Sequence, residues 1–244
     1  MGRMIGIFSG KGGTGKTTCA LNLGMAMHGF GENVMVMDCN LRNSNLALYM
    51  GIYDTSSTLH DVLESDISLL ESIHIHNSGL RFIPSSIPIR YVTSDISKLR
   101  AKLDEMDYTI IMDTPPGIGE DVISMLRLTD DIIVITNPEI PSITDTLKLI
   151  QLALDMDKHV TGVIVNRVSG KNEVSLEHIT KVCRAPIIGV VPEDRGMKKA
   201  LHERNPVLLS RPFSPASLAF KNLASKMSGR EYRQPAFARL RNMF

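Results

Sequence analysis

The chain has 244 residues, of which 43% are hydrophobic and 22% charged, and its formal net charge is +1. A chain of this length can bury a core that needs no disulfides or structural metal, and the near-neutral charge disfavours a strongly basic nucleic-acid binder. Its apolar runs stay far below the roughly 20 residues of a membrane-spanning helix. Cys19, Cys39 and Cys183 show no CxxC spacing, which argues against a disulfide framework or a zinc site. Because the first ten residues also lack the layout of a signal peptide, we expect a cytoplasmic protein with free thiols.

Short apolar runs alternate along the chain with amphipathic stretches of helical spacing, which predicts alternating strands and helices. The predicted strands are Met4–Phe8, Val34–Met37, Leu80–Ile83, Tyr108–Met112, Ile132–Thr136, Val160–Val165 and Ile187–Val190. The predicted helices are Lys16–His28, Thr58–Leu63, Val92–Leu103, Glu120–Leu128, Ile143–Leu154, Ser175–Cys183, Met197–Arg204 and Pro215–Met227. Nearly continuous apolar runs are typical of strands that helices cover on both faces. The sequence therefore predicts one α/β domain over residues 1–228, with a mostly parallel central sheet, and a tail over residues 229–244.

A glycine-rich segment between the first predicted strand and the first predicted helix fits the phosphate-binding pattern GxxxxGK[ST]. The residues expected to contact the phosphates or the metal are Gly10, Gly12, Gly13, Thr14, Gly15, Lys16, Thr17 and Thr18. The glycines let successive N–H groups point at phosphate oxygens, and the helix N-terminus adds partial positive charge. We expect Lys16 to reach the β- and γ-phosphates and the Thr17 hydroxyl to bind Mg²⁺. The pattern predicts a nucleotide site.

A second lysine, Lys11, follows the first glycine of this loop. The run GKGGTGKTT resembles the deviant Walker A motif of the MinD/ParA family of P-loop ATPases. The resemblance implies an ATP·Mg²⁺-dependent homodimer in which Lys11 reaches the phosphates bound by the partner subunit. The residues alone also allow a solvated loop lysine.

Asp113 ends the apolar run YTIIM and precedes the segment TPPGIG at 114–119. A carboxylate at the carboxyl end of a central strand lies where open α/β sheets bind ligands, so we expect Asp113 to hold a Mg²⁺-bound water. Gly117 would let a backbone N–H approach the γ-phosphate. The segment resembles the Walker B motif and second switch of the same family. Taken alone, Asp113 could instead cap the next helix.

Asp38 follows the run VMVM. MinD relatives typically carry D-x-D here as the first switch, and the second Asp helps to position the attacking water. This chain has Asn40 at that place. An amide can hydrogen-bond the water but cannot take its proton. Since phosphoryl transfer depends more on positioning and charge than on a base, the resemblance implies slow rather than absent hydrolysis. Its catalytic groups would be Lys11, Lys16, Asp38 and Asn40, with Asp38 also a Mg²⁺ ligand.

Three further segments follow predicted strands in the order that the family shows: TNPE at 136–139, Asn166-Arg167, and VVPED at 190–194. The resemblance implies that Asn166 and the backbone at Pro192–Glu193 recognise adenine, with Arg167 beside them. Asn166 suits this role because its amide can both donate and accept a hydrogen bond. Taken singly, each segment could be a helix cap or a turn.

Two other features have simpler interpretations. His74 and His76 alternate along one predicted strand, and because no third ligand lies nearby we expect a solvated face rather than a metal site. Lys198 and Lys199 are expected on a solvated helix face rather than in a DNA-binding patch.

The end of the chain is basic: residues 229–244 carry four Arg against one Glu, a charge of +3, whereas the remainder carries −2. Projected as a helix, one side holds Phe237, Leu240, Met243 and Phe244, with Arg239 opposite and Arg241 near the boundary. Such a stripe is typical of a helix that lies in a membrane interface, and it is similar to the membrane-targeting tail of MinD proteins. About three turns are too few for stability alone in water, and docking on the protein's own body or a partner is the alternative.

These observations predict a MinD-like positioning ATPase. An ATP-bound dimer would hold the inner face of the cell membrane through paired tails and recruit an activator or cargo protein, and hydrolysis would release it. Three alternatives stay open. A ParA-type DNA partition ATPase predicts a basic dimer face, which the near-neutral body does not supply. An iron–sulfur or metal carrier of the superfamily uses paired cysteines, which this chain lacks. The flagellar-positioning relative FlhG usually has an extension before the first strand.

Overall fold

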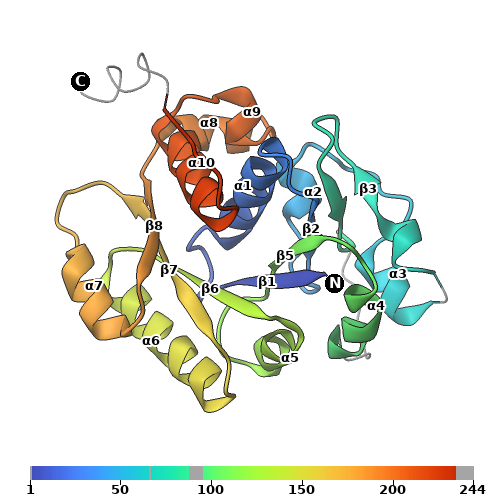
Figure 1. The fold of residues 1–244 in the computed structure, drawn as a ribbon, viewed down its shortest axis with the longest axis horizontal. Helices are drawn as coiled ribbons and strands as arrows, with labels where there is room; N and C mark the ends of the chain where they lie inside the picture. The colour runs from blue at the N-terminus through green and yellow to red at the C-terminus, as the bar shows by residue number, and fades with distance from the viewer. Residues whose placement is uncertain (1, 66, 88–95, 235–244) are drawn as a thin grey trace.

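The computed structural model describes residues 2–65, 67–87 and 96–234. Within these residues one eight-stranded sheet has the order β3-β4-β2-β5-β1-β6-β7-β8. The strands are β1 (Arg3–Phe8), β2 (Val34–Asp38), β3 (His74–Ile75), β4 (Arg81–Ile83), β5 (Thr109–Asp113), β6 (Asp131–Thr136), β7 (Val160–Val168) and β8 (Ile187–Pro192). Every pairing is parallel except that of β3 with β4. The predicted mostly parallel sheet is confirmed (Figure 1).

Helices cover both faces of the sheet. The α-helices are α1 (Lys16–Gly29), α2 (Leu46–Tyr49), α3 (Leu59–Glu64), α4 (Arg100–Asp104), α5 (Glu120–Leu128), α6 (Ile140–Asp155), α7 (Leu176–Cys183), α8 (Arg195–His202), α9 (Val207–Ser210) and α10 (Pro215–Met227), and two 3₁₀ turns are η1 (Leu70–Ser72) and η2 (Ile96–Leu99). Figure 1 shows α1 and α10 on one side of the sheet and α5, α6 and α7 on the other.

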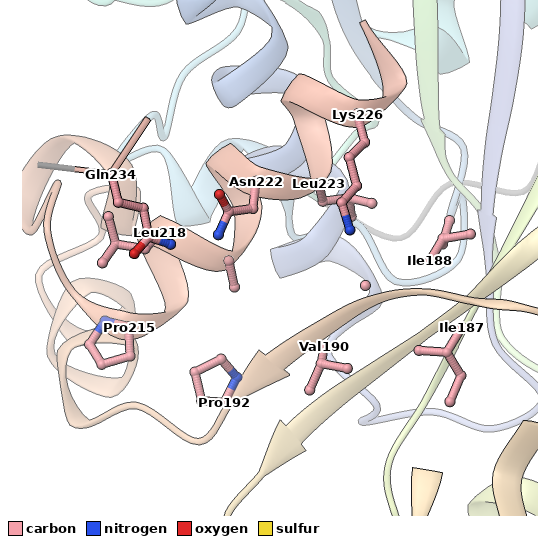
Figure 2. A pocket seen from close by; sticks show the side chains of 12 residues that line it. Ile187, Ile188, Val190, Pro192, Pro215, Leu218, Asn222, Leu223, Lys226 and Gln234 are labelled. Atoms are coloured by element: carbon pink, nitrogen blue, oxygen red, sulfur yellow. The ribbon is translucent and has the colours of Figure 1, made fainter. Parts of the chain in front are cut away.

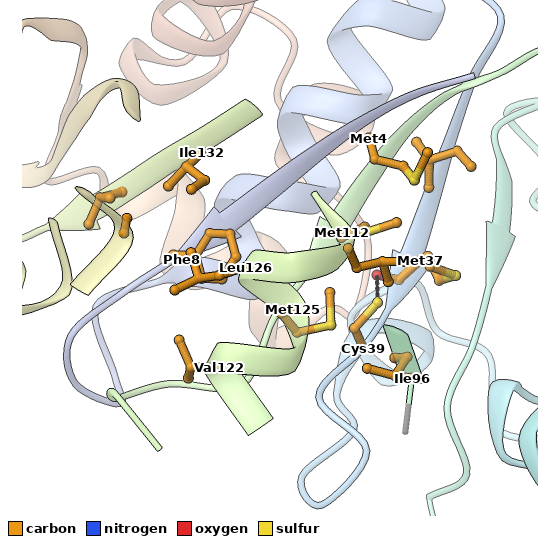
Figure 3. Packing of buried hydrophobic residues seen from close by; sticks show 14 of the residues in the cluster. Met4, Phe8, Met37, Cys39, Ile96, Met112, Val122, Met125, Leu126 and Ile132 are labelled. Atoms are coloured by element: carbon orange, nitrogen blue, oxygen red, sulfur yellow. Dashed lines mark hydrogen bonds between the residues drawn. The ribbon is translucent and has the colours of Figure 1, made fainter. Parts of the chain in front are cut away.

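Successive residues of the central strands enter two separate cores. In β1, Met4 and Phe8 pack with α5, while Ile5 and Ile7 pack with α1 and α10. Figure 3 shows Phe8 beside Val122 and Leu126 of α5. Because both faces are buried, each strand needs apolar residues at almost every position, which explains the continuous apolar runs.

The predicted helix Val92–Leu103 is confirmed only in part, because within the described residues the 3₁₀ turn η2 and the short helix α4 replace one continuous α-helix. Its part before Ile96 lies outside the described residues. The apolar residues that suggested a helix are buried, namely Ile96, Leu99 and Leu103. They belong to two successive elements, η2 and α4, rather than to one helix. The short elements α2, α9 and β3 carry too few residues to show a period.

Residues after α10 lie against the domain. Arg230 is 3.6 Å from the Glu32 carboxylate, and the Tyr232 ring stands edge-on to Phe30 with centroids 5.8 Å apart. The start of the predicted tail therefore runs along the body. The predicted membrane residues Phe237, Arg239, Leu240, Arg241, Met243 and Phe244 lie outside the described residues. Within the described residues, no helix is both long enough and apolar enough to cross a membrane.

Candidate nucleotide site

The glycine-rich loop joins the end of β1 to the start of α1 at the carboxyl edge of the sheet. Gly13 and Gly15 have φ values of 80° and 96°, a conformation that favours glycine. A Cβ on Gly10 would overlap the backbone of Asp145, and one on Gly15 would overlap the Asn166 amide. The glycines thus permit both the turn and its close packing against α6 and β7, and the turn leads directly into the N-terminus of α1.

Lys16 and Asp113 meet at the base of this loop. The Lys16 Nζ lies 3.5 Å from the Asp113 Oδ1, and both side chains are buried. Burial raises the pKa of Asp113, while the charge of Lys16 and a hydrogen bond from Thr17 act in the opposite direction. The second carboxylate oxygen, Oδ2, is buried and has no hydrogen-bond partner among the described residues. A Mg²⁺-bound water would satisfy this oxygen. The Thr17 side chain also acts on Asp113 and is the second candidate to hold the metal.

Asp38 is fully buried next to Asp113, with which it is paired in the register of β2 and β5. Burial and the Asp113 carboxylate raise the pKa of Asp38 to about 7. Its Oδ2 accepts hydrogen bonds from the Ser44 hydroxyl at 2.8 Å and the Leu46 N–H at 3.2 Å, and its Oδ1 accepts from the Asn40 N–H at 3.1 Å. Asp38 therefore orders the first switch, whereas the Asp113 Oδ2 has no hydrogen-bond partner among the described residues.

The first switch also contacts the start of α5. The Asn40 amide nitrogen donates to the Asn43 carbonyl at 3.0 Å, so the loop folds on itself. The Arg42 guanidinium lies 3.2 Å from the Asp121 carboxylate, just beyond the second switch. In that second switch, the Gly117 N–H donates to the Ser9 carbonyl at 2.9 Å. The predicted contact of Gly117 with a γ-phosphate requires this bond to break.

Lys11 lies in the phosphate loop with a third of its side chain exposed, and its Nζ is 3.7 Å from the Glu139 carboxylate. Glu139 belongs to the TNPE segment that follows β6. The Lys11 side chain is thus paired within its own subunit. This geometry is compatible with both sequence interpretations of Lys11.

The predicted adenine-binding residues gather at the ends of β7 and β8. The Asn166 amide donates to the Thr14 carbonyl at 2.7 Å, and Arg167 follows with an exposed side chain and a φ of 61°. Pro192 pairs with Val168 in the sheet, and the Glu193 N–H donates to the Val168 carbonyl at 2.9 Å. Asn166 therefore connects the expected base site to the phosphate loop.

Asn137 is a site residue that the sequence did not reveal. It is buried, and in the amide orientation that satisfies its surroundings its nitrogen donates to the Thr14 carbonyl at 3.2 Å and the Asn166 carbonyl at 3.3 Å. The side chain joins the end of β6 to the phosphate loop and to β7. Its position in TNPE was the only signal in the sequence.

His74 and His76, which the sequence predicted to lie on a solvated face, both contact nearby polar groups. The His74 Nε2 contacts the Ser57 carbonyl at 2.8 Å, and the His76 Nδ1 contacts the Ser78 hydroxyl at 2.9 Å. No group of three potential metal ligands occurs in the part of the chain that the structure describes. Cys19, Cys39 and Cys183 are free and buried.

Comparisons with known proteins agree with this geometry. Residues 1–228 match a ParA family model described as the NUBPL iron-transfer P-loop NTPase. An ATP-binding protein of Methanocaldococcus jannaschii is 36% identical over 233 residues, covering 93% of this chain and 88% of the relative. The MinD of Pyrococcus horikoshii, solved with Mg-ADP, superposes with a TM-score of 0.87 at 33% identity, covering 93% and 96% of the two chains. A chain of the MinC:MinD complex of Aquifex aeolicus superposes with a TM-score of 0.84 at 30% identity, covering 96% of this chain and 98% of that chain. The chain belongs to the MinD/ParA family of P-loop NTPases.

Proposed function

We propose that this protein is a MinD-like ATPase whose ATP-bound dimer binds a membrane reversibly and positions a partner protein. The observation that carries the proposal is Lys11, whose side chain is partly exposed although it belongs to a phosphate loop that already has Lys16. A lysine at this place can reach an anion outside its own loop, and a second subunit's phosphates are such an anion. Lys16 serves the phosphates of its own subunit.

The nucleotide state would be read by the two switches. ATP·Mg²⁺ would engage Asp113 and Thr17 through the metal, and its γ-phosphate would compete with the Ser9 carbonyl for the Gly117 N–H. Movement of the second switch would reach the first, because Arg42 pairs with Asp121. Hydrolysis would reverse these changes and open the dimer. Asn40, in place of an acid, would make that step slow.

The tail would supply the membrane contact. Phe237, Leu240, Met243 and Phe244 form its apolar stripe in the sequence. One short helix binds lipid weakly, whereas two tails on one dimer make the second contact intramolecular and raise avidity by about a hundredfold or more. Dimerisation would in this way control membrane binding. The partner is an activator or cargo protein, and MinD of Aquifex aeolicus, which forms a complex with MinC, offers a precedent.

An iron-transfer function, which the family model's description suggests, has less support in this chain. The three cysteines are buried, and burial raises the pKa of Cys19 to about 12. Thiolates are the metal-binding form, so these cysteines are poor ligands in this fold.

The proposal is tested by co-sedimentation of the full chain with anionic vesicles in ADP and in a non-hydrolysable ATP analogue, alongside a chain that ends at Arg233. We expect binding only for the full chain with the ATP analogue. Equal binding in both nucleotides, or by the shortened chain, would exclude a nucleotide-controlled tail.

A further inference from the structure

The charge of the chain is divided unevenly in space. Residues 195–234 carry nine Lys and Arg against two Glu, a formal charge of +7, although the whole chain carries +1. These residues form α8, α9, α10 and the segment after them. Figure 1 shows the three helices side by side at one end of the molecule. The near-neutral total therefore conceals one strongly basic end.

The outer surface of α8 is basic. Ala200 is the only buried residue of this helix, while Arg195, Lys199 and His202 are exposed and follow each other at helical spacing, so they lie on one side. Neither Arg195 nor Lys199 forms an ion pair with an acidic side chain within the described ranges, whereas Lys198 pairs with Glu193. The basic charge of Arg195 and Lys199 is thus available to an external anion.

Two large exposed apolar side chains belong to the segment that follows α8 and packs against it, where Arg211 pairs with Glu203 at the end of α8. Leu209 of α9 is 43% exposed and Phe213, just beyond it, is 37% exposed. The Lys221 ammonium lies 5.3 Å from the centre of the Phe213 ring. Exposed apolar groups bordered by cations are typical of proteins that rest on a lipid interface. We call Arg195, Lys199, His202, Leu209 and Phe213 the basic face.

The chain leaves the described structure beside α10, at the same end. Gln234 lines the groove between β8 and α10 next to Pro215 and Leu218, so the segment after α10 has turned back along that helix (Figure 2). Asp194 ties the start of α10 to α8, because its carboxylate accepts from the Gly196 N–H at 2.6 Å and the Ala216 N–H at 3.0 Å. Gln234, the last described residue of the predicted tail, therefore lies near the start of α10, which Asp194 ties to α8.

We propose that the basic face is a second membrane contact, which binds the phosphates of anionic lipids while the tail inserts its apolar stripe. The proposal rests on the membrane cycle of the proposed function and adds to it a choice of lipid. A basic surface could also bind nucleic acid phosphates. Leu209 and Phe213 favour lipid, since exposed aliphatic and aromatic groups beside cations gain from entering an interface and gain little from a duplex backbone.

The test uses the full chain with the non-hydrolysable ATP analogue. Arg195→Glu/Lys199→Glu is compared with Lys171→Glu/Lys181→Glu, which makes the same change in net charge at two exposed lysines around α7, on the other side of the sheet. Vesicles contain phosphatidylcholine alone or mixed with phosphatidylglycerol. On the mixed vesicles we expect Arg195→Glu/Lys199→Glu to bind at least about tenfold more weakly than wild type, and the control pair to bind as wild type. The loss should shrink as salt is raised.

Binding to duplex DNA is measured on the same variants. Three outcomes would overturn the proposal: unchanged vesicle binding by the α8 variant, an equal loss of vesicle binding in both variants, or an α8 variant that loses DNA binding and keeps vesicle binding. Unfolding temperature and nucleotide affinity are measured for each variant, and Arg195→Gln/Lys199→Gln replaces the charge reversal if it disturbs the fold. Phe237→Asp tests the tail separately. If Phe237→Asp binds vesicles as wild type does, the tail has no part in membrane binding and that part of the proposed function fails. The basic face is tested separately, by vesicle binding of the Arg195/Lys199 variants.

Discussion

Asp38 and Asp113 are paired residues of adjacent parallel strands, and both carboxyl groups are buried where the strands end. Two carboxylates in one buried site repel each other, and each pKa is raised, chiefly by burial. Lys16 offsets this charge only at Asp113. A divalent cation would stabilise both ionised groups, and we propose that the pair contributes to the Mg²⁺ site.

Asp113→Asn should therefore abolish the effect of Mg²⁺ on nucleotide binding and leave the metal-free fold nearly intact. The amide removes the repulsion with Asp38 but also the counter-charge of Lys16, so we expect the unfolding free energy to change by about 1 kcal/mol or less. Thermal unfolding with ADP, with and without Mg²⁺, measures both effects. Glu120→Gln, at the exposed start of α5, is the matched control and should keep the full Mg²⁺ effect.

Lys16 and Lys11 should separate nucleotide binding from dimerisation. Lys16→Ala removes a buried cation from the triphosphate site, and we expect ATP affinity to fall by about a hundredfold. Lys11→Ala removes a partly exposed cation that is paired with Glu139, so ATP should still bind the monomer while the ATP-dependent dimer is lost. Fluorescent-nucleotide titration and light scattering report the two steps. An equal loss of ATP affinity in both variants would make Lys11 a ligand of its own subunit.

Asn166 and Asn137 should differ in their effect on base selectivity. Asn166→Ala removes both the expected adenine contact and the hydrogen bond to the Thr14 carbonyl. ATP affinity should therefore fall by about tenfold, and the ratio of ATP affinity to GTP affinity should decrease. Asn137→Ala removes hydrogen bonds only to the backbone carbonyls of Thr14 and Asn166, so the affinities for ATP and GTP should fall by the same factor. Competition titrations with ATP and GTP compare the two variants. A change of preference in Asn137→Ala would contradict this division.

The sequence predicted those parts of the site that lie on one short segment. The bounds of α5 and α10 coincide with the predicted helices, and the phosphate loop lies between β1 and α1 as expected. Contacts between distant segments were not predictable: Asn137 acts on backbone carbonyls far from it in sequence, and Arg42 pairs across 79 positions with Asp121. The basic end was missed because its cations are spread over 40 residues and three helices, so that no local charge run marks it.

The tail should act on the membrane and not on the dimer. Phe237→Asp or Leu240→Asp places a charge in the apolar stripe, and we expect release from anionic vesicles with ATP-dependent dimerisation unchanged. Vesicle co-sedimentation and light scattering are run on the same samples, with Arg239→Lys as a control that keeps the charge. If either Asp variant also fails to dimerise, the tail packs on the body and the membrane contact should be rejected.

Asn40 offers the sharpest test of the catalytic assignment. If it stands where an acid would position the attacking water, Asn40→Asp should speed hydrolysis and leave ATP affinity within a few-fold. One water contact is worth about 1–3 kcal/mol, so the rate should rise by roughly ten- to a hundredfold. The substitution also removes the donor to the Asn43 carbonyl and adds a carboxylate beside Asp38.

Because these local changes could loosen the first switch, Asn40→Ala serves as the control; it also removes the donor to the Asn43 carbonyl but adds no carboxylate. Single-turnover hydrolysis with saturating ATP·Mg²⁺ is the measurement, since it leaves dimer release out of the observed step. A faster rate in Asn40→Asp alone assigns the water-positioning role to residue 40. An unchanged rate would mean that Asp38 and Lys11 suffice to position the attacking water. Asn40 would then only shape the loop through its hydrogen bond to the Asn43 carbonyl.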